Sequence, residues 1–239
     1  MLDSAYDRRA ALVRSLLQGT LPFAEAAAAA RTHGLMPSER YRALRARPGG
    51  RVSAHDLTRM IAAAGAVDGR GALAAVLDDE VVGVVARAPR VPPGVVAGLG
   101  TACCLAGLDS SFMLATRALE TAIAYGIEGV VDIDELSLRP AILTEPHLGE
   151  RLMDRYIRPL TSEGPFGETL RRTVHEYLAR GMRVRTTADS LYVHPNTLRH
   201  RLDRFEEITR ADLSRTQVLL ELWWALERHR LDAALGRTE

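Results

Sequence analysis

The sequence has no lysine and few aromatic residues. All 31 of its Lys+Arg positions are arginine, and only 4 Phe, 2 Trp and 6 Tyr occur in 239 residues. Without lysine the chain has no phosphate-binding P-loop lysine, no kinase-type lysine and no lysine that forms a Schiff base. The scarcity of rings argues against a protein that stacks single-stranded bases on exposed aromatics. Arginine in place of every lysine is typical of codon bias, so arginine content alone indicates no function.

Cysteine and net charge are also low. The only two cysteines, Cys103 and Cys104, are adjacent in an apolar run, and the formal net charge is +1. Adjacent cysteines make no disulfide framework, so we expect two reduced thiols, packed as small hydrophobes, in a cytoplasmic protein. The charge balance excludes a strongly basic tail but is compatible with a local basic patch. With 47% apolar and 26% charged residues, the composition is that of a globular protein.

Long hydrophobic runs are scarce. The uncharged run 91–108 approaches the length of a membrane span, but it contains two prolines and four glycines. We interpret it as a loop, a buried strand over 94–104 and a turn. The N-terminus lacks the apolar core of a signal peptide. We therefore expect a cytoplasmic location and no membrane partner.

The hydrophobic spacing predicts an α+β fold. Residues 1–40 are expected to form two helices that end near Gly19 and Gly34. Residues 41–146 are expected to form a split βαβ (ferredoxin-like βαββαβ) domain with helices on one face of the sheet. Its expected elements are a strand at 41–47, a helix at 57–64, a hairpin at 72–76 and 81–86, the strand at 94–104, a helix at 111–125 capped by Asp109-Ser110, and a strand at 129–133.

The C-terminal part is expected to be helical. Leu148, Leu152, Tyr156 and Leu160 repeat every fourth residue, which predicts a linking helix at 147–163. The segment TSEGPFG at 161–167 marks a domain boundary. Residues 164–239 are expected to form an all-α domain, with helices near 168–179, 187–192, 195–208 and 215–234.

The segment 186–205 predicts a helix-turn-helix. A short helix is followed by a tight turn and by a second helix that Pro195 opens. On the second helix Leu198, Leu202 and Phe205 share one face and are expected to be core. The opposite face and its flanks are polar and suited to base edges and phosphates. The candidate DNA-binding residues are His194, Asn196, Thr197, Arg199, His200, Arg201 and Arg204.

The charge around this segment favours the same interpretation. Between residues 180 and 204 six arginines stand against two acids, a local charge of +4 in a chain of net +1. A local excess of this kind is expected where a protein meets duplex DNA. The alternative is a solvated face on a helical cap.

The segment resembles the C-terminal helix-turn-helix of PucR/CdaR-type bacterial transcriptional regulators, over about 170–231. The family pattern is carried in order by Ala188, Leu191, His194, Asn196, Thr197, Leu198, Arg201, Leu202, Ile208, Thr209, Asp212, Leu213, Leu219, Leu222 and Leu226. Arg210 departs from it, because the family often has glycine there. The resemblance implies a DNA-binding transcriptional regulator whose helix 195–205 enters the major groove. Because one such module is small, we expect a homodimer on a two-fold operator.

Residues 41–136 are similar in element order to the GGDEF-like domain of the same family. The helix 111–125 resembles the family's central helix, and the hairpin tip 77–80 occupies the place of the diguanylate cyclase signature. Leu77 and Asp78 replace two glycines that let the backbone approach a nucleotide. We therefore expect a degenerate domain, no enzyme activity, no catalytic residues, no cofactor and no metal, with Asp78, Asp79 and Glu80 forming a solvated tip.

Two alternative functions stay open at this point, and so does the way in which the protein would respond to an effector. The α/β domain could be a ligand- or partner-binding module whose helical region serves dimerisation without DNA binding, with Trp223 or Trp224 as an interface residue. A cyclase-like enzyme is the third hypothesis. The family's usual sensing domain is expected to be absent, since about 40 residues precede the first strand. The chain is then a shortened regulator, a regulator that meets a small-molecule effector of unknown identity through its α/β domain, or one without an effector.

Overall fold

The computed structural model describes residues 2–236, with side chains from residue 7 onward, and divides into two compact units. The first unit is Met1–Pro140 and the second is Ala141–Glu239. The first contains a five-stranded mixed sheet, and the described part of the second contains only helices. The predicted α+β class is confirmed.

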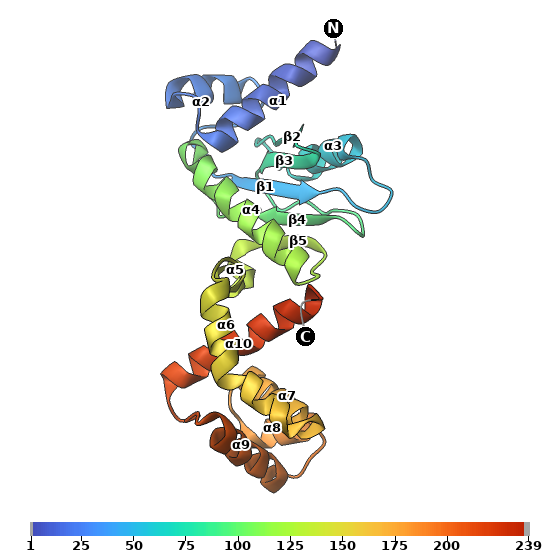
Figure 1. Ribbon diagram of the computed structural model, residues 1–239. Helices are drawn as coiled ribbons and strands as arrows, with labels where there is room; N and C mark the ends of the chain where they lie inside the picture. The colour runs from blue at the N-terminus through green and yellow to red at the C-terminus, as the bar shows by residue number, and fades with distance from the viewer. Residues whose placement is uncertain (1, 237–239) are drawn as a thin grey trace. The chain divides into compact units, whose positions relative to one another are not determined.

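The sheet has the strand order β2-β3-β1-β4-β5 (Figure 1). Its strands are β1 (Arg42–Arg47), β2 (Leu73–Leu77), β3 (Glu80–Val85), β4 (Val96–Leu99) and β5 (Gly129–Asp132). β1 pairs antiparallel with β3 and β4, and β5 runs parallel to β4. β2 and β3 form the predicted hairpin, with Leu77 opposite Glu80. Asp78 and Asp79 form the two-residue turn, and both have positive φ. A turn of this kind needs positive φ at both positions because its twist then matches that of the two strands.

The strand predicted at 94–104 is much shorter than expected. β4 itself ends at Leu99, although an isolated bridge between Tyr41 and Cys103 continues the pairing. The chain then forms the short helix η1 (Leu105–Gly107) before α4 (Leu108–Ala124). A Cβ at Gly98 or Gly100 would overlap the backbone of α4, so these glycines serve a close approach of helix and sheet. None of the helices in residues 2–236 is long and apolar enough to cross a bilayer. Cys103 and Cys104 are free, as predicted, but Cys104 is exposed rather than packed.

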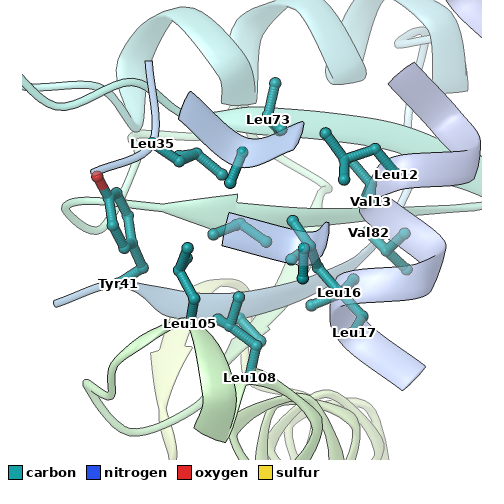
Figure 2. Packing of buried hydrophobic residues seen from close by; sticks show 14 of the residues in the cluster. Leu12, Val13, Leu16, Leu17, Leu35, Tyr41, Leu73, Val82, Leu105 and Leu108 are labelled. Carbon is teal, nitrogen blue, oxygen red and sulfur yellow. The ribbon is translucent and has the colours of Figure 1, made fainter. Parts of the chain in front are cut away.

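Helices cover both faces of the sheet, so the prediction of a single covered face was wrong. Ala43 and Leu44 of β1 are both fully buried, although neighbouring strand residues point to opposite faces. The Ala43 face is covered by α1 (Leu2–Gln18) and α4, whose Leu16 and Leu108 are seen in Figure 2. α2 (Phe23–Arg31) adds Ala26 and Ala30 to the same cluster. The Leu44 face is covered by α3 (Ala54–Ala64).

The start of α4 differs from the predicted cap. The helix begins at Leu108, after Gly107, and no side chain caps it. Asp109 lies in the first turn, where its charge favours the positive end of the helix dipole. Ser111 instead ties the helix to the sheet, because its Oγ accepts from Ala43 N at 2.9 Å and donates to Thr101 O at 2.8 Å.

The acidic hairpin tip is only partly solvated. Asp78 and Asp79 are exposed, as predicted, whereas Glu80 is buried. Its carboxylate forms ion pairs of 2.5 Å with Arg45 and 2.9 Å with Arg47. The prediction that Glu80 is solvated was therefore wrong. Arg45 and Arg47 on the neighbouring strand β1 compensate its charge, which allows the carboxylate to be buried.

The described part of the second unit has one apolar core built by five helices and a 3₁₀ segment, while a sixth helix, α5 (Arg139–Thr144), contributes no residue to it. The other elements of this unit are α6 (Pro146–Tyr156), η3 (Arg158–Glu163), α7 (Pro165–Ala179), α8 (Val184–Ser190), α9 (Pro195–Thr209) and α10 (Thr216–Ala234). α5 begins two residues before the boundary between the two units. The helix predicted at 147–163 ends at Tyr156 and continues as η3. Met153, Tyr156 and Leu160 of that segment are buried in the same core as α9.

Candidate nucleic-acid interface

α8, a tight turn and α9 form the motif that the sequence predicts (Figure 1). Val193 N donates to Ala188 O at 3.0 Å, which closes the turn after α8. Leu198 and Phe205 are fully buried and Leu202 is nearly so. The predicted core face of α9 is therefore confirmed, and its opposite face is free to present polar groups.

His194 begins α9 as its N-cap residue. Its backbone is extended, and its Nδ1 accepts a hydrogen bond of 3.2 Å from Asn196 N. Pro195 follows at the first helical position, where a missing N–H costs nothing. The His194 ring thus caps one backbone N–H at the N-terminus of α9. The other backbone N–H groups of this first turn could donate to a phosphate.

Four predicted residues are exposed together in the first half of α9: Asn196, Thr197, Arg199 and His200. Arg199 Nη1 donates to Asn196 Oδ1 at 3.0 Å. Within residues 2–236, the Asn196 NH₂ group and the other N–H groups of Arg199 donate no hydrogen bond to the protein. This arrangement presents hydrogen-bond donors over a cationic surface, which suits base edges and phosphates.

The other two predicted arginines on α9 are placed differently. Arg204 is half-buried, with 3.1 Å ion pairs to Glu163 of η3 and Glu207 of α9. Arg201 is half-buried and lines a pocket against α7 with Thr169 and Arg172. The structure therefore brings four of the predicted residues onto one exposed surface, with His194 at its end, and leaves Arg201 and Arg204 at its sides.

The local charge is smaller than the sequence count suggests. Arg180 pairs with Glu176 of α7 at 2.6 Å, and Arg204 is compensated as described above. Arg183 and Arg185 are exposed at the start of α8 and, within residues 2–236, form no ion pair. Arg183 and Arg185 contribute to the positive charge of residues 180–204, but they are not among the predicted DNA-binding residues.

Tyr192 is a surface residue that the sequence analysis missed. Its side chain is 96% exposed, and its φ of 54° places it in the left-handed region within the turn between α8 and α9. Turn residues carry no hydrophobic periodicity, so no pattern could show that this ring points outward. A tyrosine there adds a hydroxyl and a ring next to the N-terminus of α9.

The comparison with known families decides the nature of this region. Residues 170–227 match the PucR C-terminal helix-turn-helix domain. This PucR-type domain contains all of α8 and α9, together with most of α7 and the N-terminal part of α10 up to residue 227. The part of the sequence resemblance that concerns residues 170–227 is thereby confirmed.

Two further proteins are similar to this chain. An uncharacterized protein of Haemophilus influenzae is 31% identical over 115 residues, which is 45% of this chain and 30% of that protein. The chain thus matches less than a third of that relative's length. The crystal structure of a regulator of polyketide synthase expression from Bifidobacterium adolescentis aligns with 94% of this chain and 99% of its own, at 19% identity and a TM-score of 0.41.

The PucR-type domain ends its α9 helix on an unusual residue. Arg210, where the family often has glycine, has φ 54° and ψ 28°. It therefore adopts the left-handed conformation that glycine favours. Thr209 supports this turn, since its Oγ1 donates to Phe205 O at 2.7 Å and accepts from Ala211 N at 3.3 Å.

Proposed function

We propose that this protein is a sequence-specific DNA-binding transcriptional regulator whose α9 helix enters the major groove. One observation carries the proposal: within a PucR-type helix-turn-helix domain, the first half of α9 exposes polar residues on the face opposite its buried core residues. The alternative of a purely dimerising helical region would need this face to be covered by another helix. Asn196, Thr197, Arg199 and His200 are all exposed, so none of the described helices of this chain covers that face.

The proposed roles follow from the chemistry of each side chain. Asn196 can form a bidentate pair with adenine, and Thr197 and His200 can meet base edges or phosphates. Arg199 and Arg201 would hold phosphates, and His194 would set the angle of the helix N-terminus against the backbone. Arg204 can contact DNA only when a phosphate replaces its carboxylate partners.

We also propose the remaining organisation from the family resemblance. Residues 1–40 would be a helical segment, 41–146 a degenerate GGDEF-like domain without enzyme activity, 147–163 a connection and 164–239 the DNA-binding domain. Leu77 and Asp78 at the hairpin tip support the absence of cyclase chemistry, because their side chains occupy the places of two glycines. A homodimer is proposed because one such module is small for specific binding. Leu220, 59% exposed on α10, and the half-buried Trp223 one turn later offer a contact for it.

The test is fluorescence anisotropy of the full chain on a duplex from its own upstream region. A scrambled duplex and a salt series run beside it. We expect tighter binding to the native duplex, a steep loss with salt, and weakening by about 1–3 kcal/mol in Asn196→Ala. Arg117→Ala, which removes an exposed arginine from α4, is the matched control and should bind as the parent does. Equal affinity for both duplexes, unchanged in Asn196→Ala, would overturn the proposal.

A further inference from the structure

The helical unit contains a cationic pocket that DNA recognition by α9 does not use. It lies between α7 and α10 and has a volume of about 330 Å³, within the range of small-molecule sites. Its polar wall is formed by Arg171, Arg172 and His175 of α7 and by His229 and Arg230 of α10.

The remaining wall is apolar. Leu191 at the end of α8 and Leu226 of α10 line it, so the pocket has a hydrophobic side facing its cations. A pocket with these two sides suits a ligand that has an apolar body and a charged head.

The positive charges of this pocket are incompletely compensated. Its one carboxylate, Glu176, is held by Arg180, and Arg171 is held by two hydrogen bonds of 2.8 and 2.6 Å to Glu168. Within the part of the chain that the structure describes, Arg172 and His229 form no hydrogen bond or ion pair. A guanidinium that lines a pocket and has no carboxylate within hydrogen-bond or ion-pair distance can bind the charged head of an anion.

His229 is poised to respond to an anion. Its ring is half-buried, and burial, followed by the nearby positive charge of Arg171, lowers its pKa from the ordinary value of 6.5. Glu168 and Asp232 oppose this shift more weakly. A bound anion would leave the ring buried but would offset the repulsion by Arg171, which favours the protonated imidazolium.

A second pocket connects this site to the DNA-binding motif. It holds about 220 Å³ and shares Arg172 and Leu191 with the first. Its other lining residues include Val193 and Arg201. Leu191 and Val193 belong to the turn between α8 and α9, so a ligand against Leu191 touches the segment that positions α9.

We infer that the α7–α10 pocket binds a small organic anion, a phosphate ester or a carboxylate with an apolar body, and that Arg172 and His229 bind its charged head. The inference goes beyond the proposed DNA binding and does not depend on it. A phosphate of the DNA backbone has the same head-group chemistry, so the experiment separates the two sources.

The test is isothermal titration calorimetry of the full chain with phenyl phosphate, benzoate and phenol, in the absence of DNA. We expect saturable 1:1 binding of phenyl phosphate or benzoate and none of neutral phenol. Arg172→Gln and His229→Gln should each weaken the anion about tenfold, as the loss of a hydrogen bond to a charged group does. Arg151→Gln, on an exposed position of α6 outside the pocket, should bind as the parent does.

Two results would overturn the inference. One is the absence of saturation by either anion at millimolar concentrations. The other is anion binding that Arg172→Gln and His229→Gln leave unchanged while both variants keep the parental circular dichroism spectrum. If no small anion binds and Arg172→Gln weakens binding to the native duplex, Arg172 contacts a phosphate of the DNA backbone instead of a small ligand. Because the titration contains no DNA, a failure of the regulator proposal leaves this result interpretable.

Discussion

Arg204 of α9 and Glu163 of η3 are joined by a 3.1 Å ion pair between Nη2 and Oε1. The residues are 41 positions apart, and Glu207 provides a second carboxylate on α9. An arginine predicted to meet DNA is thus held by the protein's own acids. Any phosphate that binds Arg204 must compete with them.

Glu163→Gln should therefore raise DNA affinity about two- to fivefold. The substitution frees one side of Arg204 and removes a negative charge near the phosphate backbone, and an ion pair this accessible to solvent is weak enough for a phosphate to displace. Anisotropy on the native duplex measures the gain. In a protein that also carries Arg204→Ala, Glu163→Gln should raise DNA affinity less, because only the removal of the Glu163 charge then contributes. A loss of affinity in Glu163→Gln would show instead that the ion pair positions α9.

His194→Ala should destabilise the helical unit by about 1 kcal/mol, because Asn196 N loses its capping acceptor. Urea unfolding of the full chain, followed by circular dichroism, measures the change. His194→Asn is the matched control, since asparagine caps helices well and should restore stability. If His194→Ala and His194→Asn are equally stable, the ring does not cap α9. A DNA affinity that His194→Asn fails to restore would indicate a direct contact by the imidazole.

Arg210→Gly should stabilise the fold by about 0.5–1 kcal/mol. The substitution removes the strain of a left-handed non-glycine residue, about 1–2 kcal/mol, and part of that gain is lost to the greater freedom of glycine in the unfolded chain. Arg210→Ala loses the same charge but keeps the strain, so it should show no gain. The midpoint of urea unfolding distinguishes them, and equal midpoints would contradict the prediction.

The pKa of His229 predicts a loss of stability in mild acid. Because its folded pKa lies below the ordinary 6.5, the unfolded chain binds the proton more readily. The stabilising contribution of the neutral ring is therefore complete above about pH 6.5 and declines as the pH falls toward the folded pKa. The charged groups around the ring are Arg171 and Glu168 from α7 and Asp232 from α10.

His229→Gln tests this prediction. Between pH 7.5 and 5.5 the free energy of unfolding should fall less in the variant than in the parent. His147→Gln, an exposed histidine of α6, controls for the removal of one imidazole and should follow the parent. Parallel curves for all three proteins would mean that His229 does not titrate differently on folding.

The sequence alone determined the features that depend on near neighbours. The spacing of Leu198, Leu202 and Phe205 defines the buried face of α9, since residues three and four apart share a helix face. Pro195 marks the first position of that helix for an equally local reason. Asp78-Asp79 between two apolar runs sets the hairpin, because both residues tolerate the left-handed conformation of its turn.

Tertiary structure alone decided what depends on distant residues. α4 approaches Gly98 and Gly100 closely, and Glu80 is buried against arginines of β1 that meet it across the sheet. The α7–α10 pocket joins side chains more than fifty positions apart. Backbone conformation follows mainly from steric limits within a few residues. The burial and compensation of a charge depend on whichever segments the fold brings beside it.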